Sequence, residues 1–286
     1  MREITVFTHR HSNETAAALA LLAERAAQAG VTLRLDEAET RKHGLKAGPG
    51  LAVDAPAKDD VELCMVLGGD GTILRALRRY AGTEVPVFAI NFGAIGFLAT
   101  VEPEDIEDGI RLALNGEFEL LRLPGIVLGP SDDGSHVAGQ TAINDVAIHR
   151  KVGERVADLA YALDGEEAGS VRCDGLVVAT PAGSTGYNLA NGGPVMAWGV
   201  EGFVVSFIAP HSMSARALVV APDDQLTIFN RSHEPLDLAV DGRPAGEIPA
   251  GGQIGARFVN DVGTIAQLPG SSFYRRLREK FGRLAS

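Results

Sequence analysis

The sequence predicts an α/β + β protein, in which an open α/β domain is followed by a β-sandwich-like domain and a C-terminal helix that returns to the body. Strand-like and helix-like segments alternate up to residue 116, which is typical of parallel βαβ units. Many short Val/Ile/Leu-rich runs separated by Gly, Pro, Asn and Asp then follow up to residue 268, a pattern of strands and turns that is typical of a β-sandwich. We therefore expect domains at 1–116 and 117–268, and a helix in 269–286 that packs on the first domain.

In the first domain, strands are expected at residues 3–9, 31–36, 60–69 and 85–91. Helices are expected at residues 13–30, 72–81 and 104–116. The first helix has Asn13 as its expected N-cap and ends at Gly30. Residues 41–59 carry no hydrophobic period and predict a loop.

The second domain shows apolar strand-like runs at residues 126–129, 140–149, 155–165, 170–181, 202–210, 216–222, 224–230, 236–242 and 254–259. One short helix closed by glycines is expected at 184–193, and an amphipathic helix at 272–284.

Composition limits the possible partners. The 286 residues are 45% hydrophobic and 22% charged, which is ordinary for a globular protein. The formal net charge of −11 argues against broad binding of nucleic acid or anionic membranes, but it leaves an anionic small molecule open. No segment approaches the roughly 20 apolar residues that span a bilayer, and the N-terminus turns polar too early for a secretory signal. We expect a cytoplasmic protein in which Cys64 and Cys173 are reduced thiols within strands.

A glycine-rich turn with one carboxylate follows the apolar strand of residues 60–69. It reads Gly68-Gly69-Asp70-Gly71-Thr72 and opens into the next predicted helix. Glycines let a ligand approach the backbone, and the amides at a helix start attract anions. A carboxylate there repels phosphate, so Asp70 is useful if it holds a cation or takes a proton from a hydroxyl that attacks the phosphate. A plain Asp-Gly turn is the alternative.

Two polar motifs interrupt the second domain. Asn144 and Asp145 sit in an otherwise apolar predicted strand, where adjacent side chains point to opposite faces. They indicate either a structural bulge or a pair that reads a purine or ribose edge. The second motif joins Asp174 to a stretch of glycines and hydroxylated residues at 183–186, which suits phosphate or a sugar edge.

Together these motifs resemble the NAD kinase family. The matching segments are GGDGT at 68–72, NFGAIGFLA at 91–99, NDV at 144–146, DGLVVATPAGSTGYNLANGGP at 174–194 and FYRRLREKFGR at 273–283. The resemblance implies a Rossmann-like first domain and a β-sandwich-like second one. It also implies transfer of the terminal phosphoryl group of ATP or polyphosphate to the 2′-hydroxyl of the adenosine ribose of NAD, which gives NADP.

The resemblance implies roles for individual residues. Asp70 is the implied general base. Residues implied to bind NAD are Gly71, Arg75, Asn144, Asp145, Arg155, Arg172, Asp174, Thr185, Gly186, Tyr187, Asn188 and Ala190. Residues implied to bind the phosphoryl donor are Gly68, Gly69, Thr72, Gly183 and Ser184. The chain departs from the family pattern at Ala182, Gly186 and Ala190, which change size or one polar contact but leave the acid in place.

Cofactor and partners follow from the same resemblance. Mg²⁺ or another divalent cation is expected to arrive on the phosphoryl donor, because Mg²⁺ tends to bind through substrate phosphates. No His/Cys/Asp cluster has the spacing of metal ligands, so no protein-held metal is expected, and His9 and His11 are interpreted as exposed loop residues. The expected partners are small nucleotides, with no nucleic acid and no membrane, in a homodimer or homotetramer.

Two rival functions stay open. Phosphofructokinases and diacylglycerol or sphingosine kinases resemble the GGDGT turn, but a lipid or sugar kinase would leave the motifs at 144–146 and 183–187 without a role. Assays with NAD, a sphingoid base and a sugar phosphate separate these readings. A non-catalytic NAD or NADP sensor is the other rival, and the intact Asp70 disfavours it.

Overall fold

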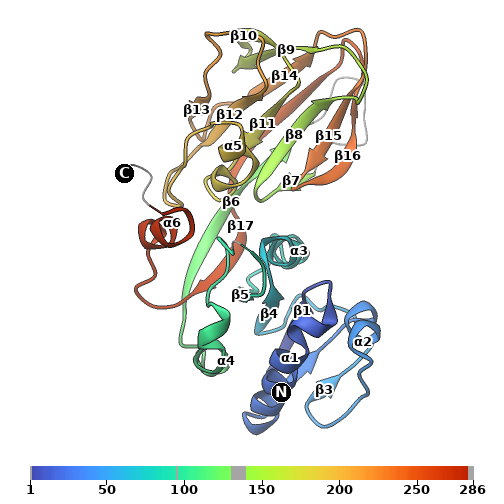
Figure 1. Ribbon diagram of the computed structural model, residues 1–286, viewed down its shortest axis with the longest axis vertical. Coiled ribbons are helices and arrows are strands. Elements are labelled where there is room, and N and C mark those ends of the chain that lie inside the picture. Colours follow the sequence, from blue (N-terminus) through green and yellow to red (C-terminus); the bar gives the residue numbers. More distant parts are fainter. Residues whose placement is uncertain (1, 95, 130–139, 283–286) are drawn as a thin grey trace. The chain divides into compact units, whose positions relative to one another are not determined.

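The computed structural model describes residues 2–94, 96–129 and 140–282. The chain divides into two compact units. Unit 1 consists of Met1–Arg122 and Gly263–Ser286, and unit 2 consists of Leu123–Val262. The structure thus has an α/β unit, a unit of antiparallel sheets and a helix near the end of the described chain (Figure 1), as the sequence predicts.

Unit 1 is built on a parallel sheet with the strand order β3-β2-β1-β4-β5. Its strands are β1 (Arg2–Thr8), β2 (Val31–Arg34), β3 (Leu51–Ala52), β4 (Leu63–Gly68) and β5 (Val87–Asn91). Ile265, near the end of β17 (Gln253–Gln267), pairs in parallel with Val87 of β5. The strand order reverses beside β1, as in doubly wound sheets, where ligands bind at the carboxyl ends of the strands.

The helices of unit 1 are α1 (Ser12–Gln28), α2 (Glu37–His43), α3 (Asp70–Arg79), α4 (Ile106–Asn115) and α6 (Phe273–Phe281), with a 3₁₀ turn at Pro103–Asp105. Helices α1 and α4 share one apolar core with Leu63, Met65 and Leu67 of β4. Because side chains alternate along a strand, Cys64 and Val66 point to the opposite face, and α3 packs against β4. The sheet is therefore covered on both faces.

Two local predictions in unit 1 are wrong. The first helix begins at Ser12 after His11, so Asn13 lies inside the first turn and is not the N-cap. The predicted loop at 41–59 contains the end of α2 and the short strand β3. Helix α2 is held at its start by the Asp36 carboxylate, which accepts a hydrogen bond of 2.8 Å from the amide of Glu39, and it ends at Gly44 in the left-handed conformation.

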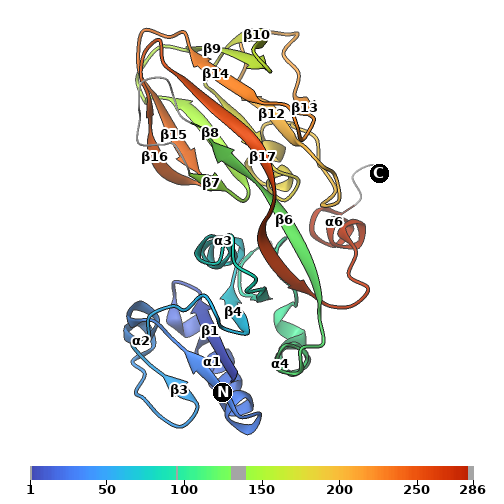
Figure 2. The same cartoon turned by 180° about the vertical axis from the view of Figure 1, so that it is seen from behind.

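Unit 2 contains two sheets. The first has the order β13-β12-β11-β8-β15-β16, and all its pairs are antiparallel. Its strands are β8 (Asp145–Arg150), β11 (Gly175–Ala179), β12 (Phe203–Ile208), β13 (Leu218–Val220), β15 (Leu236–Val240) and β16 (Arg243–Ile248). The second contains β9 (Ala157–Leu163), β10 (Glu166–Cys173), β14 (Leu226–Asn230) and β17, with β6 (Glu119–Leu128) and β7 (Thr141–Ala142) beside them (Figure 2).

The core of unit 2 lies between these sheets. Ile148 of β8 and Val178 of β11 share one buried cluster with Leu159 of β9 and Ile228 of β14. The opposite face of the six-stranded sheet is covered by the segment after β11, which contains a 3₁₀ turn (Gly183–Thr185) and α5 (Tyr187–Ala190). This segment carries the second predicted binding motif.

Both cysteines are free and buried, Cys64 in β4 and Cys173 in β10, which confirms the prediction of thiols within strands. Among the described helices, none combines the length and apolar character that crossing a bilayer requires.

Candidate functional site

The glycine turn joins β4 to α3 in unit 1. Gly68 is the last residue of β4, Gly69 caps α3, and Asp70 is the first residue of the helix. A Cβ atom on Gly68 would lie 2.7 Å from the Thr72 side chain, and one on Gly69 would lie 2.9 Å from the Cα of Gly93. Close packing within unit 1 is therefore enough to require glycine at both positions.

Gly71 differs from its two neighbours. It is exposed, and a Cβ added there would meet nothing within 4 Å. Gly71 faces a pocket of about 370 Å³, whose lining residues are Thr8, His9, Arg10, Gly69, Asp70, Gly71, Thr72 and Arg75. The pocket lies at the carboxyl ends of β1 and β4 and at the N-terminus of α3, where amides and the helix dipole favour an anion.

Asp70 is fixed by backbone amides from the segment after β5. Its Oδ2 accepts a hydrogen bond of 3.1 Å from the amide of Phe97, and its Oδ1 accepts one of 2.9 Å from the amide of Leu98. The carboxylate is half-buried and also lines the pocket. The acid is therefore oriented by the fold and open to a ligand on one side.

Arg75 lies on α3 at the edge of the same pocket. It pairs with Glu39 of α2, whose side chain is 1% exposed, and its guanidinium lies 4.6 Å from the centroid of the Phe7 ring. Burial alone would raise the pKa of Glu39, but hydrogen bonds from Lys42, Thr8 and Arg75 hold that pKa below its ordinary value. Arg75 is thus a preoriented cation beside the anion pocket.

His9, His11 and Glu14 form a cluster beside this pocket. Both imidazole Nδ1 atoms face the Glu14 carboxylate, at 2.9 Å for His9 and 3.1 Å for His11. Their possible ligand atoms lie within 4.8 Å of one another, so the fold brings together three groups that could hold a metal ion. His11 is exposed as predicted, whereas His9 is half-buried. The three residues are separated by only one and two positions, a spacing that the sequence pattern did not single out.

In unit 2, the motif at 143–145 is held by a residue that the sequence did not single out. The Asp241 carboxylate accepts hydrogen bonds from the amides of Ile143, Asn144 and Asp145, the shortest being 2.7 Å from Asn144. The predicted continuous strand over 140–149 is therefore wrong, because the chain breaks between β7 and β8 at Ile143 and Asn144. The available signal was the Val-Asp-Gly turn, where Asp241 adopts a positive φ of 47°.

Asn144 and Asp145 are held in place through their backbone amides, and their side chains offer polar groups for further contacts. The buried Oδ1 of Asn144 accepts no hydrogen bond from the part of the chain that the structure describes. Asp145 is 8% exposed, and burial together with the nearby Asp241 raises its pKa to about 7. Since buried polar groups normally have partners, this pair is suited to contact a polar ligand.

The segment after β11 divides into supporting and accessible residues. Gly183 packs so closely that a Cβ would lie 2.0 Å from the Asn144 carbonyl oxygen. Ser184 is fully buried, and its Oγ donates to the Pro181 carbonyl and accepts from the Met196 amide. Asn188 is also fully buried and donates to the carbonyls of Ser184 and Pro194. These three residues support the segment from inside unit 2.

The accessible residues of the segment are Gly186 and Ala190, which are exposed, and Thr185 and Tyr187, which are half-buried. The Tyr187 ring stacks on His149 of β8 with centroids 5.6 Å apart and an angle of 23° between the ring planes. Burial lowers the pKa of His149. A neutral imidazole thus supports one face of the tyrosine ring.

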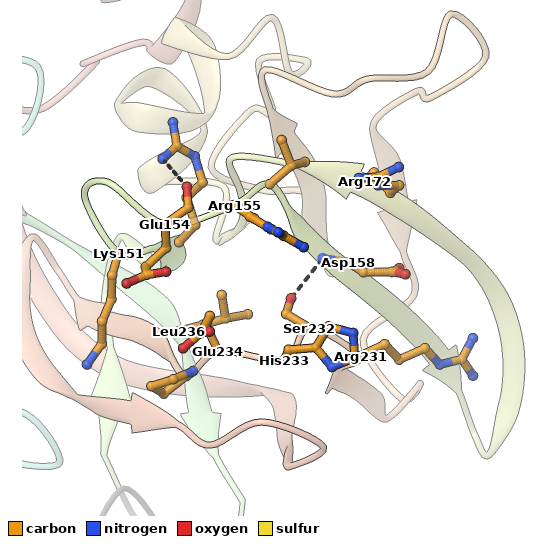
Figure 3. A pocket seen from close by; sticks show the side chains of 13 residues that line it. Lys151, Glu154, Arg155, Asp158, Arg172, Arg231, Ser232, His233, Glu234 and Leu236 are labelled. Atoms are coloured by element: carbon orange, nitrogen blue, oxygen red, sulfur yellow. Dashed lines mark hydrogen bonds between the residues drawn. The ribbon is translucent and has the colours of Figure 1, made fainter.

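Arg155 and Arg172 meet at a second pocket in unit 2. Both side chains are exposed, and both line a cavity of about 620 Å³ in which Arg155 points toward Ser232 (Figure 3). Asp174 lies between β10 and β11, where the chain passes from one sheet to the other, and it pairs with Arg150 at 2.6 Å. The pocket is therefore lined by four guanidinium groups, those of Arg150, Arg155, Arg172 and Arg231, and Asp174 contacts it through its ion pair with Arg150.

Comparisons with known proteins agree on one family. Residues 7–118 match the model described as the ATP-NAD kinase N-terminal domain, and residues 143–258 match the ATP-NAD kinase C-terminal domain. The NAD kinase of Rhodopirellula baltica is 36% identical over 224 residues, which cover 78% of this chain and 72% of that protein. NAD kinase 2 of Streptomyces coelicolor is 32% identical over 282 residues, which cover 97% and 94%.

Solved structures have the same fold. The crystal structure of an NAD kinase from Archaeoglobus fulgidus in complex with ATP matches with a TM-score of 0.71 and 26% identity, over 98% of both chains. Yeast NADH kinase complexed with NADH matches in fold with a TM-score of 0.84 at 22% identity, over 100% of this chain and 89% of that one. With both family models and these relatives in agreement, the chain belongs to the NAD kinase family.

Proposed function

We propose that this NAD kinase uses Asp70 as the general base for the transfer of a phosphoryl group from ATP to NAD. Phosphorylation of NAD is the activity of the family, and the role of Asp70 is the one that the resemblance implies. The observation that carries the proposal is the double amide contact, in which Phe97 and Leu98 fix both carboxylate oxygens while Asp70 lines an anion pocket. A fixed base with one open side can align with an incoming hydroxyl.

The chemical step needs one general base and a set of hydrogen-bond donors around the phosphate. The 2′-oxygen of the adenosine ribose of NAD forms a bond to the terminal phosphorus of ATP, and the bond from that phosphorus to the bridging oxygen of ADP breaks. The proton of the hydroxyl passes to Asp70. Because the transition state is loose, positioning and charge neutralisation supply most of the rate. Gly71, Thr72 and Arg75 offer the amides, hydroxyl and cation for this purpose.

In this proposal, residues of unit 2 bind NAD. Asn144 and Asp145 offer polar groups to the adenosine part, and Thr185, Gly186, Tyr187 and Ala190 present the accessible surface beside a base. Arg155, Arg172 and Asp174 serve the nicotinamide riboside end. Gly68, Gly69, Gly183, Ser184 and Asn188 act by holding the backbone, since packing already accounts for them.

A divalent cation enters this proposal with the donor. Mg²⁺ prefers oxygen ligands, whereas the cluster of His9, His11 and Glu14 offers two imidazole nitrogens. Asp70 is the one carboxylate among the described residues that line the anion pocket, which is too few oxygen ligands for a dedicated Mg²⁺ site. We further propose a homo-oligomer, and a reducing compartment such as the cytoplasm, which suits two free buried thiols.

Asp70→Asn tests the proposal, because it keeps the shape of the side chain and removes the base. We expect kcat to fall by about 10²-fold or more, measured with ATP, Mg²⁺ and NAD, and with NADP detected by a dehydrogenase specific for it. Calorimetric affinity for NAD should change little. Asp60→Asn, at an exposed position of unit 1, is the matched control. An Asp70→Asn enzyme that turns over at the wild-type rate would remove Asp70 from this role.

A further inference from the structure

Side chains of α6 converge on the segment that holds Asp70. The Arg276 guanidinium donates a hydrogen bond of 2.8 Å to the carbonyl oxygen of Phe97 and another to that of Ala99. Both contacts lie within unit 1. They fix two carbonyls of a stretch of chain that has no helix or strand of its own at these residues.

The contacts of Arg276 and Asp70 meet on one peptide group. The carbonyl of Phe97 and the amide of Leu98 belong to the same planar peptide group. Arg276 donates a hydrogen bond to the oxygen of that group, and the Leu98 N–H of the same group donates to Asp70 at 2.9 Å. A cation on the oxygen polarises the peptide group and strengthens its N–H as a donor. The positive charge of Arg276 therefore strengthens the hydrogen bond from that N–H to the Asp70 carboxylate.

The rest of α6 holds Arg276 in position. The Phe97 ring contacts Phe273 and Phe281 of α6 at centroid distances of 5.8 Å and 5.7 Å. Lys280 pairs with Glu102, which also accepts a hydrogen bond of 2.9 Å from the Asn91 side chain. Aromatic contacts and an ion pair therefore fasten both ends of the segment to the helix.

We propose that Arg276 is the positioning residue for the catalytic carboxylate, and that it keeps Asp70 oriented through the peptide group between Phe97 and Leu98. This inference rests on the proposed role of Asp70. The charged groups around Arg276 are Glu102 after β5, Asp70 on α3 and Glu279 on α6. Of these, Asp70 is the one that accepts a hydrogen bond from the peptide that Arg276 polarises.

The test compares Arg276→Ala and Arg276→Lys with Arg275→Ala, an exposed arginine on the same helix. For Arg276→Ala we expect kcat to fall by about 10-fold or more, with KM for NAD changed less than about threefold. Arg276→Lys keeps a cation and should recover part of kcat, and it keeps the test available if the alanine variant does not fold. Arg275→Ala should match the wild type.

A double-variant cycle separates positioning from general support. In an Asp70→Asn background, Arg276→Ala should have little further effect on kcat, since the group that it serves is gone. An equal loss in both backgrounds, or a KM for NAD that rises in Arg276→Ala as much as kcat falls, overturns the inference. If Asp70→Asn alone is fully active, the proposed function of Asp70 fails instead, and the two failures are thereby distinguished.

Discussion

Three glycines of one turn face different surroundings, so the same substitution should have different effects at each. Gly69 lies against the backbone of Gly93, whereas Gly71 faces the open pocket from the first turn of α3. Contact with a ligand is thus the remaining reason for a glycine at position 71, while packing explains the glycine at position 69.

Gly71→Ala should leave the fold intact and weaken donor binding. Alanine favours a helix over glycine by about 0.5–1 kcal/mol, so the free energy of unfolding in urea should stay equal or rise. A methyl group in the pocket should raise KM for ATP by about 10-fold. Gly69→Ala is the contrast, since its Cβ would lie 2.9 Å from a backbone atom, and it should lose about 1–3 kcal/mol of stability. Destabilisation by Gly71→Ala with an unchanged KM would contradict this division.

Asp145 links stability to pH. Burial, with Asp241 nearby, raises its pKa from 3.8 to about 7. The folded state therefore binds more protons than the unfolded state between these pH values, and the contribution of Asp145 to stability falls as the pH rises from about 4 to about 7. Above that range Asp145 is ionised in the folded state, and the full destabilising effect of its burial is present.

Asp145→Asn should remove this penalty. We expect urea unfolding at pH 8 to show a variant more stable by about 1–3 kcal/mol, with a smaller difference at pH 5. KM for NAD should rise, because a group proposed to contact NAD is altered, so stability and activity should change in opposite directions. Equal stability of the two proteins at both pH values would show that Asp145 is not strained by its burial.

At the scale of elements, long periodic segments were predictable and short polar ones were not. In α1 and α3, apolar residues recur at helical spacing over several turns, and the buried positions follow that spacing. Helix α2 has only seven residues, two of them buried, so its hydrophobic period is too short to register. Its usable signal was the pair Asp36 and Glu39 before a glycine.

The candidate site shows the same limit. The turn at 68–72 and the pair Asn144 and Asp145 could be found in the sequence because each interrupts an apolar run with polar residues. The residues that hold them could not. Asp241 reaches its three amides from almost a hundred residues away, and Arg276 reaches the Phe97 carbonyl across an even longer separation. Contacts of this kind depend on tertiary structure, which local patterns do not contain.

For the molecule as a whole, the two thiols offer one reporter for each unit. Cys64 lies in unit 1 and Cys173 in unit 2, and both are fully buried. Burial raises the pKa of both thiols, to about 11 for Cys173. Since the thiolate is the reactive form, neither should react quickly with a disulfide reagent at pH 8 while its unit is folded.

Cys64→Ala and Cys173→Ala variants should therefore report the two units separately. In a urea titration, the remaining thiol of each variant should become reactive only as its own unit opens. Labelling measured by mass spectrometry would give one midpoint for each unit. Rapid labelling of either thiol without urea would contradict the burial of these strands.

The division of the chain into units has a consequence for biosynthesis. Unit 1 is assembled from Met1–Arg122 and Gly263–Ser286, whereas unit 2 is one continuous stretch between them. A ribosome therefore delivers every residue of unit 2 before it delivers α6 and the end of β17. Unit 1 is therefore begun first and completed last. Until the end of β17 is translated, the edge of its sheet at β5 lacks that strand and is exposed or covered by a chaperone.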